Sequence, residues 1–137
     1  LYNQDHDGNE VDVVKQFRAQ IQSAQAVIFV TPEYNRSIPG VLKNALDQAS
    51  RPYGKSVWAG KPAAVAGVSV GAIGTALAQQ HLRNVLAYLD MPTLAQPEIF
   101  IQAKDGLFAE DGSIGAGSRD FVNGFVQKFA AWARKHQ

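Results

Sequence analysis

The chain has 137 residues, a formal net charge of +1 and no cysteine. The missing cysteines exclude disulfides, thiolate catalysis and cysteine-ligated metal sites, and the scattered basic residues disfavour nucleic-acid binding. No apolar run approaches the roughly 20 residues of a membrane span, so we expect a cytoplasmic protein that contacts neither membrane nor nucleic acid.

Strand and helix patterns alternate along the chain. Short apolar runs bounded by turn residues predict strands, and apolar residues three to four positions apart predict helices. The expected elements, in chain order, are a helix over 10–24, a strand over 26–30, a helix from 39 to about 50, a strand over 63–68, a helix over 75–89, a strand over 97–101, a loop over 103–117 and a helix from about 122 to 135. This alternation predicts one α/β domain over residues 1–137, with a parallel sheet and right-handed crossovers.

The most informative motif lies between the first strand and the next helix. Residues 31–47 read Thr-Pro-Glu-Tyr-Asn-Arg-Ser-Ile-Pro-Gly-Val-Leu-Lys-Asn-Ala-Leu-Asp. Open α/β sheets bind ligands where such turns follow the carboxyl ends of strands. We expect the N–H groups of Glu33, Tyr34 and Asn35 to face a ligand's carbonyls and ring nitrogens, with the Tyr34 ring as an aromatic face.

A second turn follows the strand over 63–68. It reads Ser69-Val70-Gly71-Ala72-Ile73-Gly74 and leads directly into a helix. Glycine allows close backbone approach and positive φ, and a helix N-terminus offers unpaired N–H groups to an acceptor. The pattern predicts a second ligand contact beside the first turn.

Together, the two motifs resemble the signature of the NADPH-dependent FMN reductase family, the flavodoxin-like quinone, azo-dye and chromate reductases. The family pattern P-E-Y-N-x-S-x-P-x-x-L-K-N-A-x-D is matched at every fixed position over residues 32–47, and S-x-G-x-x-G over residues 69–74. The resemblance covers nearly the whole chain from about residue 22 onward. It implies an α/β fold of the flavodoxin-like class, an open parallel sheet with helices on both faces.

Family members begin with a strand, a loop that wraps the FMN phosphate, a helix and a second strand. The resemblance places Leu1 just after these elements, so we expect a chain that lacks the first two strands and the first helix. In the flavodoxin strand order 2-1-3-4-5 the three expected strands are the third to the fifth. We therefore expect the strand over 26–30 to expose one edge, which is a liability for aggregation.

The function implied by the resemblance is that of an FMN-dependent NAD(P)H oxidoreductase. Hydride would pass from NADPH or NADH through FMN to a quinone, an azo compound, a flavin or a metal oxyanion such as chromate. Because the cofactor carries this chemistry, we expect no catalytic side chain and no metal. The resemblance also implies a homodimer or homotetramer. The expected cofactor-binding residues are Pro32, Glu33, Tyr34, Asn35, Ser69, Gly71 and Gly74.

Two alternatives stay open from the residues. One is a flavodoxin proper, a one-electron carrier without turnover, although the pI of about 8.2 disfavours it because flavodoxins are typically acidic. The other is a non-catalytic flavin-fold interaction module, which the missing phosphate loop makes conceivable. The three histidines lie far apart in the sequence, and we expect none of them to be catalytic.

Overall fold

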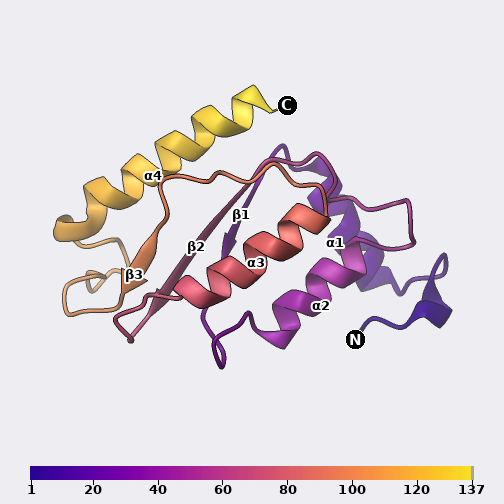
Figure 1. Cartoon of the computed structure of the whole chain (residues 1–137), viewed down its shortest axis with the longest axis horizontal. Helices are drawn as coiled ribbons and strands as arrows, with labels where there is room; N and C mark the ends of the chain where they lie inside the picture. The colour runs from indigo at the N-terminus through magenta and orange to yellow at the C-terminus, as the bar shows by residue number, and fades with distance from the viewer. Residues whose placement is uncertain (137) are drawn as a thin grey trace.

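The structure, a computed structural model, describes residues 1–136 and contains a three-stranded parallel sheet. The strands are β1 (Val27–Val30), β2 (Ala63–Ser69) and β3 (Phe100–Gln102). They lie in the order β1-β2-β3, with Val27 opposite Ala63 and Gly67 opposite Phe100. Because the strands are parallel, their carboxyl ends meet at one edge of the sheet, the lower edge in Figure 1.

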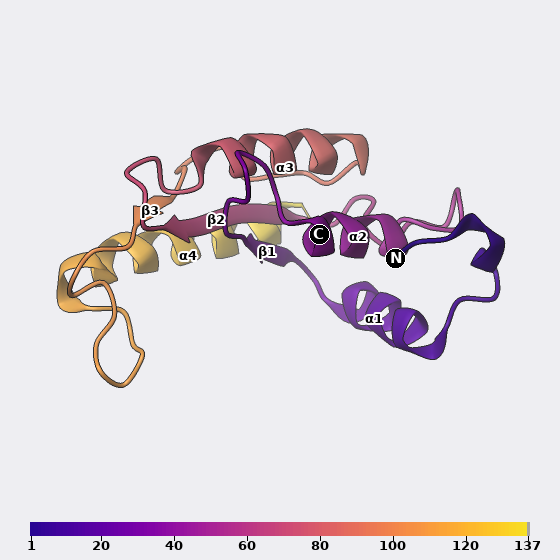
Figure 2. The ribbon, with the colours of Figure 1, turned by 90° about the horizontal axis from the view of Figure 1, so that it is seen from below.

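Helices cover both faces of this sheet. The helices are the 3-10 helix η1 (Gln4–His6) and the α-helices α1 (Asp12–Ser23), α2 (Gly40–Ala49), α3 (Ala76–Tyr88) and α4 (Ala116–Lys135). Seen from below, α3 lies on one side of the strands and α4 on the other (Figure 2). The predicted flavodoxin-like arrangement, with helices on both faces, is confirmed.

The core is divided in two by β2, whose first five residues are all buried. Ala63 and Val65 belong to a cluster that contains Trp58 and the α3 residues Leu82 and Leu86. Residues Ala64 and Ala66 of β2 belong to the second cluster, which includes α4 side chains. A central parallel strand buried on both faces reads as a continuous apolar run, and its small residues let the helices pack closely.

Two predicted boundaries were wrong. The third strand is Phe100–Gln102 rather than 97–101, because β2 pairs with it only from Gly67 onward and the Ile99 carbonyl accepts a hydrogen bond from the Gln79 side chain instead. The last helix begins at Ala116, about six residues before the first periodic apolar position. The turns that it adds to the expected helix are largely exposed, so they carry no apolar pattern.

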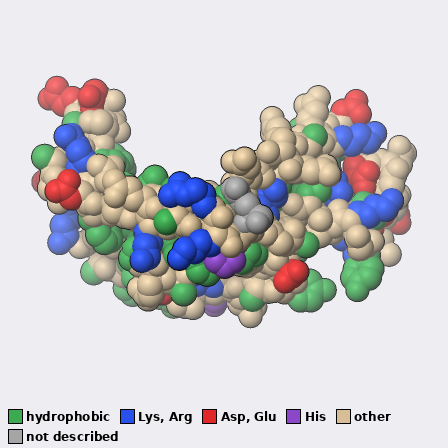
Figure 3. Space-filling view, turned by 90° about the horizontal axis from the view of Figure 1, so that it is seen from above, with side chains coloured by type: hydrophobic (Ala, Val, Ile, Leu, Met, Phe, Trp, Pro, Cys, Tyr) green, Lys and Arg blue, Asp and Glu red, His purple; other side chains and the backbone are tan. Residues whose placement is uncertain are grey.

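The β1 strand lies at the edge of the sheet, as predicted. Within residues 1–136 it pairs with β2 alone, and its Ile28 and Val30 side chains are 37% and 72% exposed. The surface in Figure 3 is hollowed between two raised ends. In Figure 2 these ends correspond to the loop before α4 and to the part of the molecule that carries α1.

Among the described helices, none is long and apolar enough to cross a membrane.

Candidate functional site

Two turns lie side by side at the carboxyl edge of the sheet. The first turn, residues 31–37, follows β1, and the second turn, residues 69–74, follows β2. Since β1 and β2 are hydrogen-bonded parallel neighbours, both turns leave the sheet on the same side (Figure 1). This is where open α/β sheets bind their ligands, and the structure brings all seven predicted cofactor-binding residues to this edge.

The first turn is closed by its own backbone. The Tyr34 N–H donates to the Ser37 carbonyl at 2.9 Å, and the Ser37 N–H donates to the Tyr34 carbonyl at 3.0 Å. Asn35 and Arg36 between them have φ of 49° and 67°, the left-handed conformation of a tight two-residue turn. The prediction of a free Tyr34 N–H was therefore wrong, because this group is already paired.

Other groups of the first turn remain open to a ligand. Among residues 1–136, the backbone N–H groups of Glu33 and Asn35 have no hydrogen-bond partner. Pro32 is exposed, and the Tyr34 side chain is 61% exposed. The turn thus presents two backbone donors and an aromatic ring to its surroundings.

The Glu33 side chain points to the start of α3. Its Oε2 accepts the N–H groups of Leu77 at 3.1 Å and Ala78 at 3.0 Å. The neighbouring N–H groups are used as well, since Ala76 donates to the Ile73 carbonyl and Gln79 to the Thr75 carbonyl. The prediction that this helix N-terminus offers unpaired donors was therefore wrong.

The second turn depends on its two glycines in different ways. Gly71 is exposed and donates its N–H to Ser69 Oγ at 3.1 Å, and a Cβ added there would meet nothing closer than 3.6 Å. Gly74 is buried with φ 58°, and a Cβ there would lie 2.7 Å from the Phe100 carbonyl carbon. Gly74 therefore lets the turn pack against β3, whereas Gly71 leaves space on the open side. The N–H groups of Ala72 and Ile73 have no partner within the described part of the chain.

A buried polar pair supports the second turn from behind. Thr75 and Gln79 are 1% and 0% exposed, and Gln79 Nε2 donates to Thr75 Oγ1 at 3.0 Å and to the Ile99 carbonyl at 2.8 Å. These bonds tie the first turn of α3 to the segment before β3. Sequence reasoning missed this pair, although a glutamine on the buried side of a helix was a signal that could have found it.

A groove with a volume of about 590 Å³ begins beside the first turn and runs between α2 and α3. His81, in α3, has its Nδ1 2.9 Å from Ser37 Oγ, so this histidine contacts the first turn although no role was predicted for it. Lys43, on the α2 side, pairs at 2.8 Å with Asp47, which lies four residues later on the same helix face. The lining residues are Ser37, Ile38, Gly40, Lys43, His81, Asn84 and Val85.

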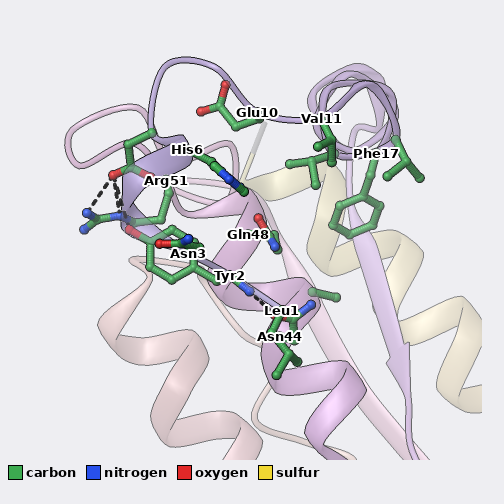
Figure 4. Close-up of a pocket in the computed structure, with 14 residues that line it drawn as sticks. Leu1, Tyr2, Asn3, His6, Glu10, Val11, Phe17, Asn44, Gln48 and Arg51 are labelled. Atoms are coloured by element: carbon green, nitrogen blue, oxygen red, sulfur yellow. Dashed lines mark hydrogen bonds and ion pairs between the residues drawn. The ribbon is translucent and has the colours of Figure 1, made fainter.

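A second cavity, of about 490 Å³, lies far from the turns in the fold. It is enclosed by the N-terminal segment, α1 and α2, and Figure 4 shows Tyr2, Asn44, Gln48 and Phe17 around it. Asp7 and Arg51 hold the segment in place through an ion pair at 2.8 Å. None of its lining residues belongs to either turn. The cavity therefore does not contribute to the site at the carboxyl edge.

The open groups of the two turns fit a flat ring with polar edges. Unpaired N–H donors in both turns can meet ring carbonyls and nitrogens, and the exposed Tyr34 ring can pack beside an aromatic system. An isoalloxazine has this combination of properties. The start of α3 is not open to a phosphate group, because the Glu33 carboxylate already accepts the N–H groups that would bind an anion there.

Comparisons with known proteins show which family the chain matches. The family described as NADPH-dependent FMN reductase matches residues 1–105. A 2-hydroxy-1,4-benzoquinone reductase from a Burkholderia species is 53% identical over 135 residues, covering 98% of this chain and 74% of that protein. A quinone reductase from Pseudomonas putida is 47% identical, covering 98% and 73%. Among solved structures, the flavoenzyme NAD(P)H:(acceptor) oxidoreductase FerB from Paracoccus denitrificans has a TM-score of 0.93 at 44% identity, covering 98% of this chain and 75% of that one.

Proposed function

Because this chain belongs to the NADPH-dependent FMN reductase family, we propose that it binds FMN at the first and second turns and reduces quinones with NADPH or NADH. The parallel pairing of β1 with β2 supports the proposal, because it places both turns at one edge, with backbone N–H groups that have no partner among residues 1–136. FMN, when bound, supplies the hydride-accepting and hydride-donating chemistry. The protein's part is to bind and orient the ring.

Each predicted cofactor-binding residue has a specific part in this proposal. The Glu33 and Asn35 N–H groups donate hydrogen bonds to the polar edge of the ring. Pro32 restricts the backbone between β1 and these two donors. The exposed Tyr34 side chain packs beside the ring. Ser69 holds the N–H of Gly71 and so keeps the second turn open on the ligand side. Gly74 does not contact the ring in this proposal; because it lacks a Cβ, the second turn can pack against β3.

We propose a quinone as the electron acceptor, because two relatives are named for quinone reduction. The test is steady-state kinetics with NADPH and 2-hydroxy-1,4-benzoquinone. Two hydride steps at one site give ping-pong kinetics, and therefore parallel double-reciprocal lines. Intersecting lines, or no quinone-dependent oxidation of NADPH by FMN-loaded protein, would contradict the proposal. Parallel assays with azo compounds, free flavin and chromate compare their rates of reduction with that of the quinone.

The electron-carrier alternative finds no support among the relatives, which are named as reductases. The same kinetic experiment separates the two functions, because a one-electron carrier oxidises little NADPH by itself. Assembly as a homodimer or homotetramer and a cytoplasmic location remain part of the proposal. Sedimentation of the FMN-loaded protein measures the first of these directly.

A further inference from the structure

Glu33 connects the two turns through its side chain. The Glu33 side chain is only 12% exposed, and one carboxylate oxygen, Oε2, accepts both the Leu77 N–H and the Ala78 N–H. The acceptor and its donors are 44 and 45 residues apart in the chain. A residue of the first turn thus caps the helix that begins directly after the second turn.

The start of α3 needs this cap because its own sequence supplies none. Thr75, directly before the helix, has φ 70° and makes no side-chain capping hydrogen bond. Its hydroxyl is used instead as the acceptor for Gln79 Nε2. Helices commonly satisfy their first N–H groups with a side chain from the preceding residue. Here a carboxylate from another loop does so, and its negative charge complements the positive end of the helix dipole.

The arrangement separates the backbone and side chain of Glu33 into different tasks. The backbone N–H, which has no partner in the described part of the chain, lies in the turn proposed to meet the ring, while the carboxylate accepts hydrogen bonds from α3. Arg36 adds a weak contact to the other carboxylate oxygen at 3.8 Å, with its own side chain 64% exposed. Such an exposed pair adds little, so the two amide bonds define the position of the carboxylate.

We propose that Glu33 is a positioning residue that sets the separation of the first and second turns and thereby the slot for the flavin ring. This inference rests on the proposed function, since it assumes that the ring lies between the turns. Precise placement by groups outside the ligand contact is a general requirement of binding sites built on loops. Without the bridge, β1 and β2 still pair, and among residues 1–136 the contact of Ser37 Oγ with His81 Nδ1 is the polar link that remains between the first turn and α3.

Because a single carboxylate oxygen accepts both hydrogen bonds, substitutions of Glu33 can separate the effect of its charge from that of its length. Glu33→Gln keeps an oxygen at the same distance along the side chain and removes the charge. Glu33→Asp keeps the charge and shortens the side chain by one methylene, so that it cannot reach both amides. Glu33→Ala removes the bridge altogether. Gln80→Ala is a matched control, because it removes another side-chain hydrogen bond of α3, to Glu98 at 3.3 Å, without touching either turn.

The first measurement is fluorescence titration of FMN with each variant, together with the visible absorption spectrum of the bound flavin. We expect Glu33→Ala and Glu33→Asp to weaken FMN binding at least tenfold and to shift the flavin spectrum. We expect Glu33→Gln and Gln80→Ala to stay within threefold of the wild type with an unchanged spectrum. Wild-type affinity in Glu33→Ala, or an equal loss in Gln80→Ala, would overturn the positioning role. A loss in Glu33→Gln as large as in Glu33→Ala would also overturn it, by assigning the effect to charge.

The second measurement is hydrogen exchange of the flavin-free protein. We expect the Leu77 and Ala78 amides to exchange at least tenfold faster in Glu33→Ala than in the wild type, and at the wild-type rate in Glu33→Gln. Unchanged protection in Glu33→Ala would overturn the bridge itself. If the wild type binds no FMN, the proposed function fails, while hydrogen exchange still decides whether Glu33 joins the turns. If Glu33→Ala does not fold, Glu33→Asp against Glu33→Gln makes the same comparison.

Discussion

The first and second turns lie side by side at one edge of the sheet, yet different forces hold them in shape. The first turn is held by hydrogen bonds, two between Tyr34 and Ser37 and two that the Glu33 carboxylate accepts from backbone N–H groups of α3. The second turn is held largely by close packing, since Gly74 lies against the backbone of β3. The first turn should therefore be sensitive to loss of its hydrogen-bond partners and to residues that cannot adopt positive φ, and the second turn to a single added carbon.

The largest expected effect is in the second turn. Gly74→Ala puts a Cβ 2.7 Å from the Phe100 carbonyl carbon and 2.8 Å from the Ile101 nitrogen, and neither backbone atom can rotate away. Overpacking together with the left-handed conformation should lower the free energy of unfolding by about 3 kcal/mol. Urea denaturation measures this. Gly71→Ala, in the same turn, is the control and should change the free energy of unfolding by less than about 1 kcal/mol. Similar losses of stability in both variants would contradict the different roles of the two glycines.

A smaller effect is expected from the backbone of the first turn. Proline does not fit at position 35, because Asn35 has φ 49° and proline is restricted to about −65°. The Asn35→Pro substitution should open the Tyr34–Ser37 pair and lower stability by about 2 kcal/mol. Asn35→Gly, which suits the same φ, should retain stability. Thermal unfolding of the two variants compares them, and a stable Asn35→Pro protein would show that this turn is not the rigid element described.

The next effect concerns the hydrogen bond inside the second turn. Ser69→Ala removes the oxygen that accepts the Gly71 N–H at 3.1 Å. Because the site is partly exposed, water can replace the bond, and we expect a loss of about 0.5–1 kcal/mol in unfolding free energy. Ser69→Thr keeps the hydroxyl and serves as the matched control. A loss above that of Asn35→Pro would mean that polar contacts, and not packing, hold the second turn.

The smallest effect is expected for Arg36. Its guanidinium lies 3.8 Å from Glu33 and is mostly exposed, so Arg36→Ala should cost less than about 0.5 kcal/mol. Arg36→Gly should be neutral or stabilising, because φ 67° is strained for arginine and free for glycine. Chemical denaturation of both variants at low and high salt measures the difference. A large, salt-dependent loss in Arg36→Ala would assign the position of Glu33 to the ion pair instead of to α3.

Much of the fold could be predicted because its signals are local or belong to a motif. The family, the flavodoxin-like sheet and the reductase class with its FMN and NAD(P)H requirement all follow from motifs whose residues lie close together in the sequence. The exposed edge of β1 follows from the strand order that the family implies. These predictions are confirmed.

The site's internal contacts could not be predicted in the same way. The Glu33 cap joins residues 44 positions apart, and no local spacing indicates which N–H groups a carboxylate will find. The Tyr34 N–H was expected to be free because the left-handed pair Asn35–Arg36 that closes the turn was not anticipated. Gly74 is matched by the motif, but its packing on β3 depends on a strand whose boundaries were misplaced.

Amide chemical-shift mapping of the protein during FMN titration measures whether FMN binds between the two turns. We expect the largest shifts at the amides of Glu33, Asn35, Ala72 and Ile73, which have no hydrogen-bond partner within residues 1–136. Amides around the N-terminal cavity, such as Tyr2 and Asn44, should stay unchanged. Shifts concentrated at that cavity, or FMN binding that leaves the amide shifts of both turns unchanged, would contradict FMN binding between the turns.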